Sequence, residues 1–165
     1  EAIDDEGWFH TGDAGYMVGN ELFLSDRIKD LYKTSNGKYI APQQIESKLI
    51  VDKYIDQIVV VADRYKFVSA LIVPSYSLLE EYAKSQGIEY ANISSLCKNE
   101  QIHQFLMERI STLQQDLACY EQVKRFCLLP QPFNIERNEM TNTLKMKRKV
   151  IFEHYHDEIE AMYQC

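Results

Sequence analysis

Two apolar runs near the middle of the chain give the clearest indication of secondary structure. Residues 55–62 and 67–73 are rich in β-branched side chains, and the polar residues 63–66 separate them. Continuous apolar runs of this length, bounded by turn residues, are typical of central strands buried on both faces. The pattern therefore predicts two buried strands here, and residues 123–129, which stop before Pro130, predict a third.

Helices are predicted where apolar side chains recur every three or four residues. Pro42 can begin a helix because its missing N–H falls among the unpaired donors of the first turn. Ile45, Leu49 and Ile50 mark the buried face of that helix. The same spacing predicts further helices around residues 78–83, over 99–119 and over about 146–162.

Turn residues near the start of the chain separate four short strand patterns. Residues 15–24 have apolar flanks around the Gly-Asn pair at 19–20, which is a typical two-residue hairpin turn. Residues 31–34 and 38–40 predict two further strands, with a turn at 35–37. Together these elements indicate an α+β fold, a small mixed β-sheet flanked by helices and preceded by a β-hairpin.

Size and composition limit the class of protein. With 165 residues, 45% of them apolar and 26% charged, the chain can fold as one domain, or as one domain with an added segment. A net charge of −7 argues against a nucleic-acid binder, since contacts to phosphates need a basic surface. No apolar run approaches the roughly 20 residues that span a bilayer. The chain begins without Met, so we expect a fragment of a longer protein.

The cysteines and histidines indicate neither a disulfide framework nor a metal site. The four cysteines form no CxxC pair and have no regular spacing, which favours reduced thiols and a cytoplasmic protein. His154 and His156 are two residues apart, so a helix would point them to different faces. We therefore expect no metal ligands in this chain, and surface positions for both histidines.

Three sequence blocks carry the candidate chemistry. The first, residues 7–13, reads GWFHTGD, and the second joins DRIKD at 26–30 to SNGKYIAP at 35–42. The third, residues 141–148, reads TNTLKMKR. In this order and at this spacing the blocks resemble motifs near the end of the adenylate-forming superfamily, which comprises acyl-CoA synthetases, luciferases and peptide-synthetase adenylation domains. The long separation of the second and third blocks, and the form TLKxKR, look most like long-chain acyl-CoA synthetases.

The resemblance implies a division of the chain and an activity for the parent enzyme. Residues 1–28 would be the tail of a large N-terminal domain that binds ATP and fatty acid, and residues 29–165 the mobile C-terminal lid. The parent enzyme would convert a fatty acid and ATP to acyl-AMP and then transfer the acyl group to CoA, its co-substrate. ATP and Mg²⁺ would be held mainly by the missing N-terminal domain, the partner of this chain. The isolated chain is expected to be inactive, and peripheral membrane association of the parent stays open.

Two residues match the family's nucleotide site. The resemblance implies that Asp13 accepts hydrogen bonds from both ribose hydroxyls of ATP, a role that suits the two oxygens of a carboxylate. It also implies that Arg27 approaches the ribose and the phosphates, where a planar guanidinium can donate twice. Without the resemblance, Asp13 is a turn residue before a strand and Arg27 is a solvated surface arginine.

The second block carries the residues that would move the lid and receive CoA. Lys29 matches the hinge, where a change in backbone torsions swings the lid between two positions. After that swing, the resemblance implies that Ser35, Asn36 and Gly37 line the pantetheine channel, with Gly37 allowing close backbone approach. The residues alone indicate a polar connection at the hinge and a turn at 35–37.

Position 44 departs from the family pattern. The family usually has Glu where Gln44 stands in this sequence, ahead of Ile45 and Glu46. Glu46 is therefore the better-supported acid of this stretch, and we assign it only a structural role.

Lys145 is the strongest catalytic candidate. The resemblance implies that it bridges the substrate carboxylate and the α-phosphate while acyl-AMP forms, because a long, compact cation can stabilise the negative charge on both groups. If the last helix begins near residue 145, Lys145 and the basic residues 147–149 crowd its positive end. Each would oppose the macrodipole by roughly 0.3–1 kcal/mol. A broken local rule of this kind often marks a functional site.

The basic cluster leaves other interpretations open. Under the resemblance, Lys147 and Arg148 would contact the phosphates of CoA, but such a run is also typical of a solvated basic helix face or a nuclear-localisation signal. Two alternative functions also stay open. One is the lid of another adenylating enzyme, luciferase-like or carrier-protein-loading, and the other is a non-catalytic anion-binding or interaction module.

Overall fold

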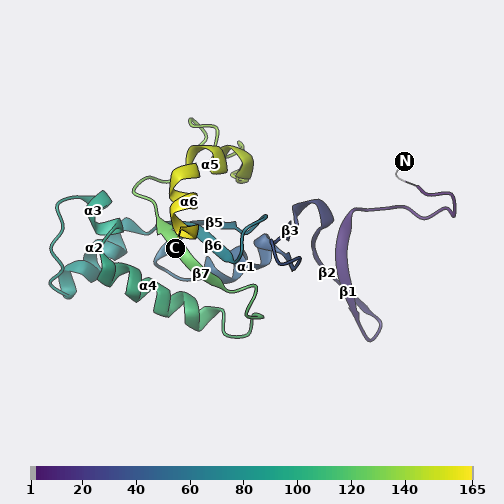
Figure 1. Cartoon of the computed structure of the whole chain (residues 1–165), viewed down its shortest axis with the longest axis horizontal. Helices are drawn as coiled ribbons and strands as arrows, with labels where there is room; N and C mark the ends of the chain where they lie inside the picture. The colour runs from purple at the N-terminus through teal and green to yellow at the C-terminus, as the bar shows by residue number, and fades with distance from the viewer. Residues whose placement is uncertain (1–2, 165) are drawn as a thin grey trace.

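The computed structural model describes residues 3–164, except for the side chains of residues 25, 26 and 29. A β-hairpin at the N-terminal end projects away from a body that holds all the other elements (Figure 1). In chain order the elements are β1 (Asp13–Val18), β2 (Glu21–Arg27), a 3₁₀ turn η1 (Ile28–Asp30), β3 (Tyr32–Lys33), β4 (Tyr39–Ile40), α1 (Pro42–Leu49), β5 (Ile55–Val61), β6 (Val68–Pro74), α2 (Tyr76–Ser85), α3 (Ile93–Cys97), α4 (Glu100–Leu113), β7 (Val123–Leu128), α5 (Arg148–His154) and α6 (His156–Tyr163).

The body is built on a three-stranded mixed sheet in the order β5-β6-β7. β5 and β6 pair antiparallel, with Val59 opposite Leu71, whereas β6 and β7 pair parallel, with Ile72 opposite Leu128. Every residue of β6 is buried, as its continuous apolar run predicts. The three strands predicted from the sequence and the α+β class are therefore confirmed.

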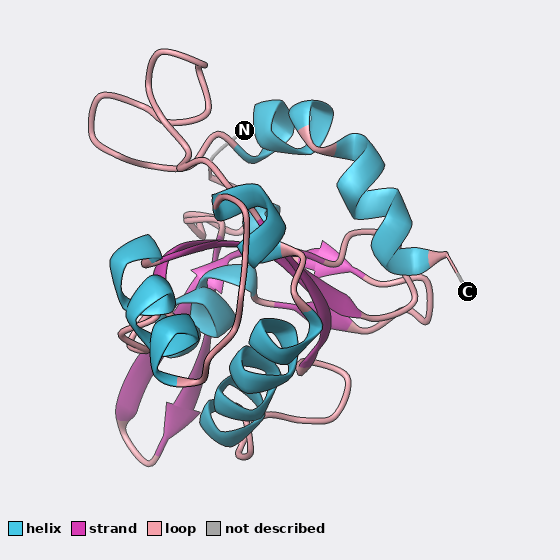
Figure 2. Ribbon diagram, turned by 90° about the vertical axis from the view of Figure 1, so that its left-hand side faces the viewer, coloured by secondary structure: helices cyan, strands magenta, loops and turns pink. Residues whose placement is uncertain are grey.

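Helices cover both faces of this sheet (Figure 2). Side chains alternate along a strand, so Ile58 and Val60 of β5 join one apolar cluster while Val59 and Val61 join the other. The first cluster includes apolar residues of α1, α2 and α4, and the second includes residues of α5 and α6. Two faces with separate apolar clusters explain why the strand sequences show no polar alternation.

The end of α4 differs from the sequence-based prediction of a helix over 99–119. Asn99 caps its start, since its side chain accepts from the backbone N–H groups of Gln101 and Ile102. The helix ends at Leu113, and the next side chain, Gln114, forms two hydrogen bonds with the backbone of Val123, at 3.0 Å and 2.8 Å. The prediction ran too far because this contact with the following strand overrides the helical spacing of Leu117.

Two other helix predictions are also corrected. The single helix expected over about 146–162 is two helices, α5 and α6. They are separated at Tyr155, which has a non-helical backbone with φ of −111° and ψ of 29°. No glycine or proline marks this break. Ile50, predicted on the buried face of α1, follows the helix end and is 39% exposed. α3 was not predicted at all.

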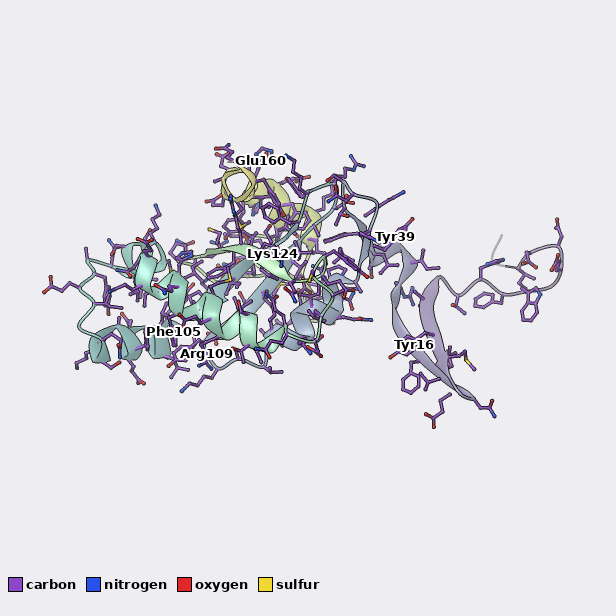
Figure 3. All side chains as sticks on the ribbon, turned by 60° about the horizontal axis from the view of Figure 1, so that its bottom comes forward. Tyr16, Tyr39, Phe105, Arg109, Lys124 and Glu160 are labelled. Carbon is purple, nitrogen blue, oxygen red and sulfur yellow. The ribbon has the colours of Figure 1, made fainter. Side chains whose placement is uncertain are left out.

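The β1–β2 hairpin has the Gly-Asn turn expected at 19–20, between Val18 and Glu21. Gly15 lies at an irregularity in the pairing, where a Cβ atom would come within 2.7 Å of the carbonyl oxygen of Phe23. Tyr16 is exposed on this hairpin, where Figure 3 labels it. The other large apolar residues exposed at this end are Ile3, Trp8, Phe9, Met17, Val18, Leu22, Phe23, Leu24 and Ile28. A two-stranded hairpin is marginal alone, so this apolar surface indicates contact with another protein surface.

Within residues 3–164, the helices are too short and too polar for any of them to cross a bilayer.

Candidate functional site

Residues 139–147 form a short tongue, and Lys145 lies on its returning side, directly after the turn at 142–144. The backbone N–H of Thr141 donates to the carbonyl oxygen of Lys145 at 2.9 Å, and the N–H of Lys145 donates to Oγ1 of Thr141 at 3.0 Å. A β-bridge between Met140 and Met146 closes the tongue below this turn. The backbone of Lys145 is therefore fixed by hydrogen bonds while its side chain is exposed.

Lys145 lies outside the last helix, which corrects the expectation that the helix begins near residue 145. α5 begins at Arg148, with Lys147 as its N-cap residue. The residue before the lysine, Leu144, has a φ of +61° and is 66% exposed. A left-handed conformation costs a branched L-residue about 1–2 kcal/mol, and such strain tends to be kept where function needs it.

An open polar cavity of about 540 Å³ lies beside the tongue. Its walls come from the 3₁₀ turn η1, from α1, and from the end of the tongue with the start of α5; the lining residues are Asp30, Gln43, Glu46, Ser47, Lys145, Met146 and Arg148. The cavity thus brings the catalytic candidate beside residues next to the predicted hinge, although more than 100 positions separate Lys145 from Asp30 in the sequence.

A buried carboxylate anchors the base of the tongue. Glu139, 1% exposed, accepts from Nη2 of Arg137 at 2.9 Å, from the N–H of Asn134 at 3.1 Å and, on its other oxygen, contacts Nδ1 of His154 at 3.1 Å. Burial alone would raise the pKa of Glu139, but these partners outweigh it and lower that pKa. The N–H of Lys147 also donates to the carbonyl oxygen of Glu139 at 2.7 Å.

The basic residues that follow Lys145 have partners within the chain. The ammonium group of Lys147 donates to Oδ1 of Asn138. The guanidinium of Arg148 donates to both carboxylate oxygens of Glu46, at 2.5 Å and 2.7 Å. Glu46 therefore has a structural contact, as expected, and it neutralises the cation at the first position of α5. The first turn of α5 has no acidic residue of its own, and Glu46 of α1 supplies the negative charge that favours a helix N-terminus.

The two residues of the predicted nucleotide site lie together in the hairpin. Asp13 and Arg27 are cross-strand partners of β1 and β2, and Nε of Arg27 lies 3.4 Å from Oδ1 of Asp13. The N–H of Asp13 donates to Oγ1 of Thr11 at 3.1 Å. Their pairing gives a carboxylate and a guanidinium on one partly exposed surface, which suits a ligand with both hydroxyl and phosphate groups.

The predicted hinge and the 35–37 loop lie on either side of β3. Lys29 is in the 3₁₀ turn that joins the projecting hairpin to the body (Figure 1). Beyond β3, the loop is tied to a neighbouring connection, since the N–H of Ser35 donates to the carbonyl oxygen of Tyr65 and Nδ2 of Asn36 donates to that of Lys66. Gly37 has a φ of +76°, and an added Cβ atom would meet no atom within 4 Å. The loop does not line the cavity beside Lys145.

Several residues of this site were not found from the sequence. Asp30, Gln43 and Ser47 line the cavity, but nothing in their spacing marks them. Glu139 and Arg137 have no periodic signal either, because their neighbours are brought together by an irregular loop. Of these residues, only Asp30 belongs to one of the motif blocks, as the last residue of DRIKD.

The described part of the chain contains no cluster of three His, Cys, Asp or Glu residues that could hold a metal ion. Cys97, Cys119 and Cys127 are free thiols.

Comparison with known proteins gives one family match. The family described as AMP-binding enzyme C-terminal domain matches residues 29–165. The matched residues include the segments 35–42 and 141–148 of the second and third blocks, whereas the first block, residues 7–13, lies outside them.

Curated relatives extend the similarity over nearly the whole chain. Long-chain-fatty-acid–CoA ligase 6 of Homo sapiens is 33% identical over 167 residues, covering 99% of this chain and 24% of that protein. Long-chain-fatty-acid–CoA ligase 1 of Cavia porcellus is 31% identical and long chain acyl-CoA synthetase 7, peroxisomal, of Arabidopsis thaliana is 29% identical, with the same coverage. The chain thus spans about a quarter of the length of the curated relatives it matches.

Solved structures share the fold. The adenylation domain of a carboxylate reductase from Mycobacterium chelonae superposes with a TM-score of 0.78 at 23% identity, covering 98% of this chain and 24% of that chain. A fatty acyl CoA synthetase of Mycobacterium tuberculosis gives a TM-score of 0.51 at 22% identity, covering 95% and 26%. At these identities the similarity shows the fold alone.

Proposed function

Because this chain belongs to the family of AMP-binding enzyme C-terminal domains, we propose that it is the mobile lid of an AMP-forming long-chain fatty-acid–CoA ligase. The names of the curated relatives support this choice of reaction and substrate class. The observation that carries the proposal is the tongue, which holds the backbone of Lys145 in place and leaves its ammonium group exposed.

The proposed division of the chain places residues 1–28 at the end of a larger N-terminal domain and residues 29–165 in the lid. The exposed apolar surface of the β1–β2 hairpin supports this division, because such a surface needs a protein neighbour. ATP, Mg²⁺ and the fatty acid would bind mainly in that larger domain. The free thiols are consistent with a cytoplasmic parent enzyme.

In the first step of the proposed reaction, a carboxylate oxygen of the fatty acid attacks the α-phosphorus of ATP and pyrophosphate leaves. Negative charge then builds on the oxygens around phosphorus. An ammonium group held at this place stabilises that charge without having to reorganise, which is the usual source of large rate effects. Lys145 supplies this group, and Asp13 and Arg27 hold the ribose and phosphates.

In the second step, the thiol of CoA attacks the acyl carbon of acyl-AMP, and AMP leaves. Between the two steps the lid would rotate at Lys29. The rotation would move the Lys145 tongue out of the active site and bring the loop at 35–37 into its place. The separation of this loop from the cavity beside Lys145 supports a lid with two working faces. Lys147 stays a candidate for contacts with the phosphates of CoA.

Gly37→Ala tests the second face. In the parent enzyme we expect thioester formation from supplied acyl-AMP to fall about tenfold, because the new methyl group would narrow the thiol channel, while acyl-AMP formation is unchanged. Gly87→Ala is the matched control, since Gly87 also has a positive φ, +67°, and no atom near an added Cβ. Equal losses in both variants would mean that backbone strain, and not the channel, explains the effect.

The chain alone provides a second test. We expect purified residues 1–165 to catalyse no exchange of pyrophosphate into ATP with any fatty acid, because this chain would supply only the lid. Exchange by the chain would contradict the proposal.

In the parent enzyme, a product other than acyl-CoA from a panel of acids would favour a luciferase-like or carrier-protein-loading enzyme.

A further inference from the structure

We propose that Glu46 and Arg148 are positioning residues that hold the Lys145 tongue in place for acyl-AMP formation. This inference rests on the proposed function, because it assigns a task to Lys145. Nothing in the sequence motifs indicates it, since the two residues are separated by 102 positions. From the sequence, a phosphate contact was only one of the interpretations left open for Arg148.

The ion pair joins two helices through a fixed geometry. Glu46 lies on α1 and Arg148 begins α5, and the two guanidinium nitrogens reach the two carboxylate oxygens at 2.5 Å and 2.7 Å. The side chains are 15% and 22% exposed. A two-point contact between planar groups fixes orientation as well as distance, and little water competes with it here.

Glu46 is itself held by the central sheet. Its Oε1 also accepts from the backbone N–H of Val60 at 2.7 Å, and Val60 is fully buried in β5. The side chains of Ile45 and Leu49 bury the same helix against the body. The carboxylate thus connects the start of α5 to the buried central sheet.

The tongue has one anchor at each end. Its first residue, Glu139, is held by Arg137, and the residue directly after its last, Arg148, is held by Glu46. Loss of the second anchor alone leaves the Thr141–Lys145 turn and the first anchor intact. We therefore expect a loosened lysine in a folded domain. A misplacement of about 1 Å can cost a reaction roughly 100-fold.

The same pair contacts the strand that follows the hinge. The guanidinium of Arg148 lies over the ring of Tyr32, 5.9 Å from the ring centre. Nearby, Nε2 of Gln43 donates to Oδ2 of Asp30 at 3.4 Å. These contacts join β3, α1 and α5 into one unit, so that a rotation at Lys29 would carry Lys145 with it.

Glu46→Gln in the parent enzyme tests this inference. The amide oxygen can still accept from Val60, but the charge that binds Arg148 is lost. We expect acyl-AMP formation to fall roughly 10- to 100-fold, with thioester formation from supplied acyl-AMP unchanged. We expect Arg148→Lys also to slow acyl-AMP formation and to leave thioester formation unchanged, because an ammonium group cannot bind both carboxylate oxygens in a fork.

Asp52→Asn is the matched control. Asp52 is 4% exposed and binds Nε of Arg109 on α4 at 2.8 Å, so it is also a buried carboxylate in an ion pair (Figure 3 labels Arg109). Loss of this ion pair should lower the thermal midpoint of unfolding. It should not slow acyl-AMP formation more than it slows thioester formation. If Glu46→Gln keeps full acyl-AMP formation, or loses both half-reactions equally, the positioning role is wrong.

Lys145→Ala separates this inference from the proposed function. If that variant loses acyl-AMP formation and Glu46→Gln does not, only the positioning role fails. If Lys145→Ala keeps acyl-AMP formation, the proposed function fails, and the positioning role fails with it.

Discussion

Replacing Lys145 by Ala in the parent enzyme is expected to slow acyl-AMP formation by roughly 100- to 1,000-fold, the range seen when one preorganised donor to a developing charge is removed. The reason is that the ammonium group would face the negative charge that builds during attack on the α-phosphorus. Thioester formation from supplied acyl-AMP should be spared, because the lid would then present its other face. Pyrophosphate release and acyl-CoA formation measure the two steps separately.

Lys149→Ala provides the control for the Lys145 variant. Lys149 is an exposed lysine of the same basic run, but it lies within α5 and does not line the cavity beside the tongue. Its loss removes one positive charge from this surface and should leave both steps unchanged. Equal effects of the two variants would indicate a general attraction of anions by the basic run, as expected of an anion-binding module.

Glu139→Ala is expected to cause the largest loss of stability, with a decrease of about 2–4 kcal/mol in the free energy of unfolding at pH 7. The substitution removes the acceptor of the part-buried N–H of Asn134 and of Nε of Arg137. Unfolding of residues 1–165 in urea measures this loss. Glu136→Ala, at an exposed acid of the same loop, should change the free energy by less than about 0.5 kcal/mol.

The effect of Glu139 should depend on pH in a defined direction. Its pKa is lowered in the folded chain, whereas an unfolded glutamate has a pKa of about 4.3. The carboxylate therefore stabilises the fold fully above the unfolded pKa, and this contribution is lost as the pH falls through the lower folded pKa. The difference between the natural chain and Glu139→Ala should shrink as the pH falls from above the unfolded pKa through the lower folded pKa. A difference that grows in this range would show that the anionic carboxylate is not the stabilising form.

The features predicted correctly from the sequence depend on local patterns. The strands β5 and β6 could be predicted because β-branched residues form unbroken runs between polar turns. The hairpin turn at 19–20 could be predicted because Gly-Asn favours it whatever surrounds it. In each case, the residues that determine the structure are neighbours in the chain.

The features that were missed depend on contacts between distant residues. α4 stops where Gln114 binds the backbone of Val123, and the ion pair of Glu46 is with Arg148, 102 positions away. Lys145 itself was proposed from a motif, and its spacing suggested a helix where the structure has a strained turn at Leu144. No periodicity predicts which polar side chains will meet in an irregular loop.

The parallel pairing of β6 and β7 has a consequence for how this chain folds. β5 and β6 are joined by a short connection, but residues 75–122 separate β6 from β7. Bringing distant segments together lowers the chain entropy before their contacts can stabilise the pair, so long-range strand pairing is slow. We therefore expect the first two strands to associate early and β7 to add late. The segment that presents Lys145 follows β7 and packs on the completed sheet, which makes it the last part of the molecule to assemble.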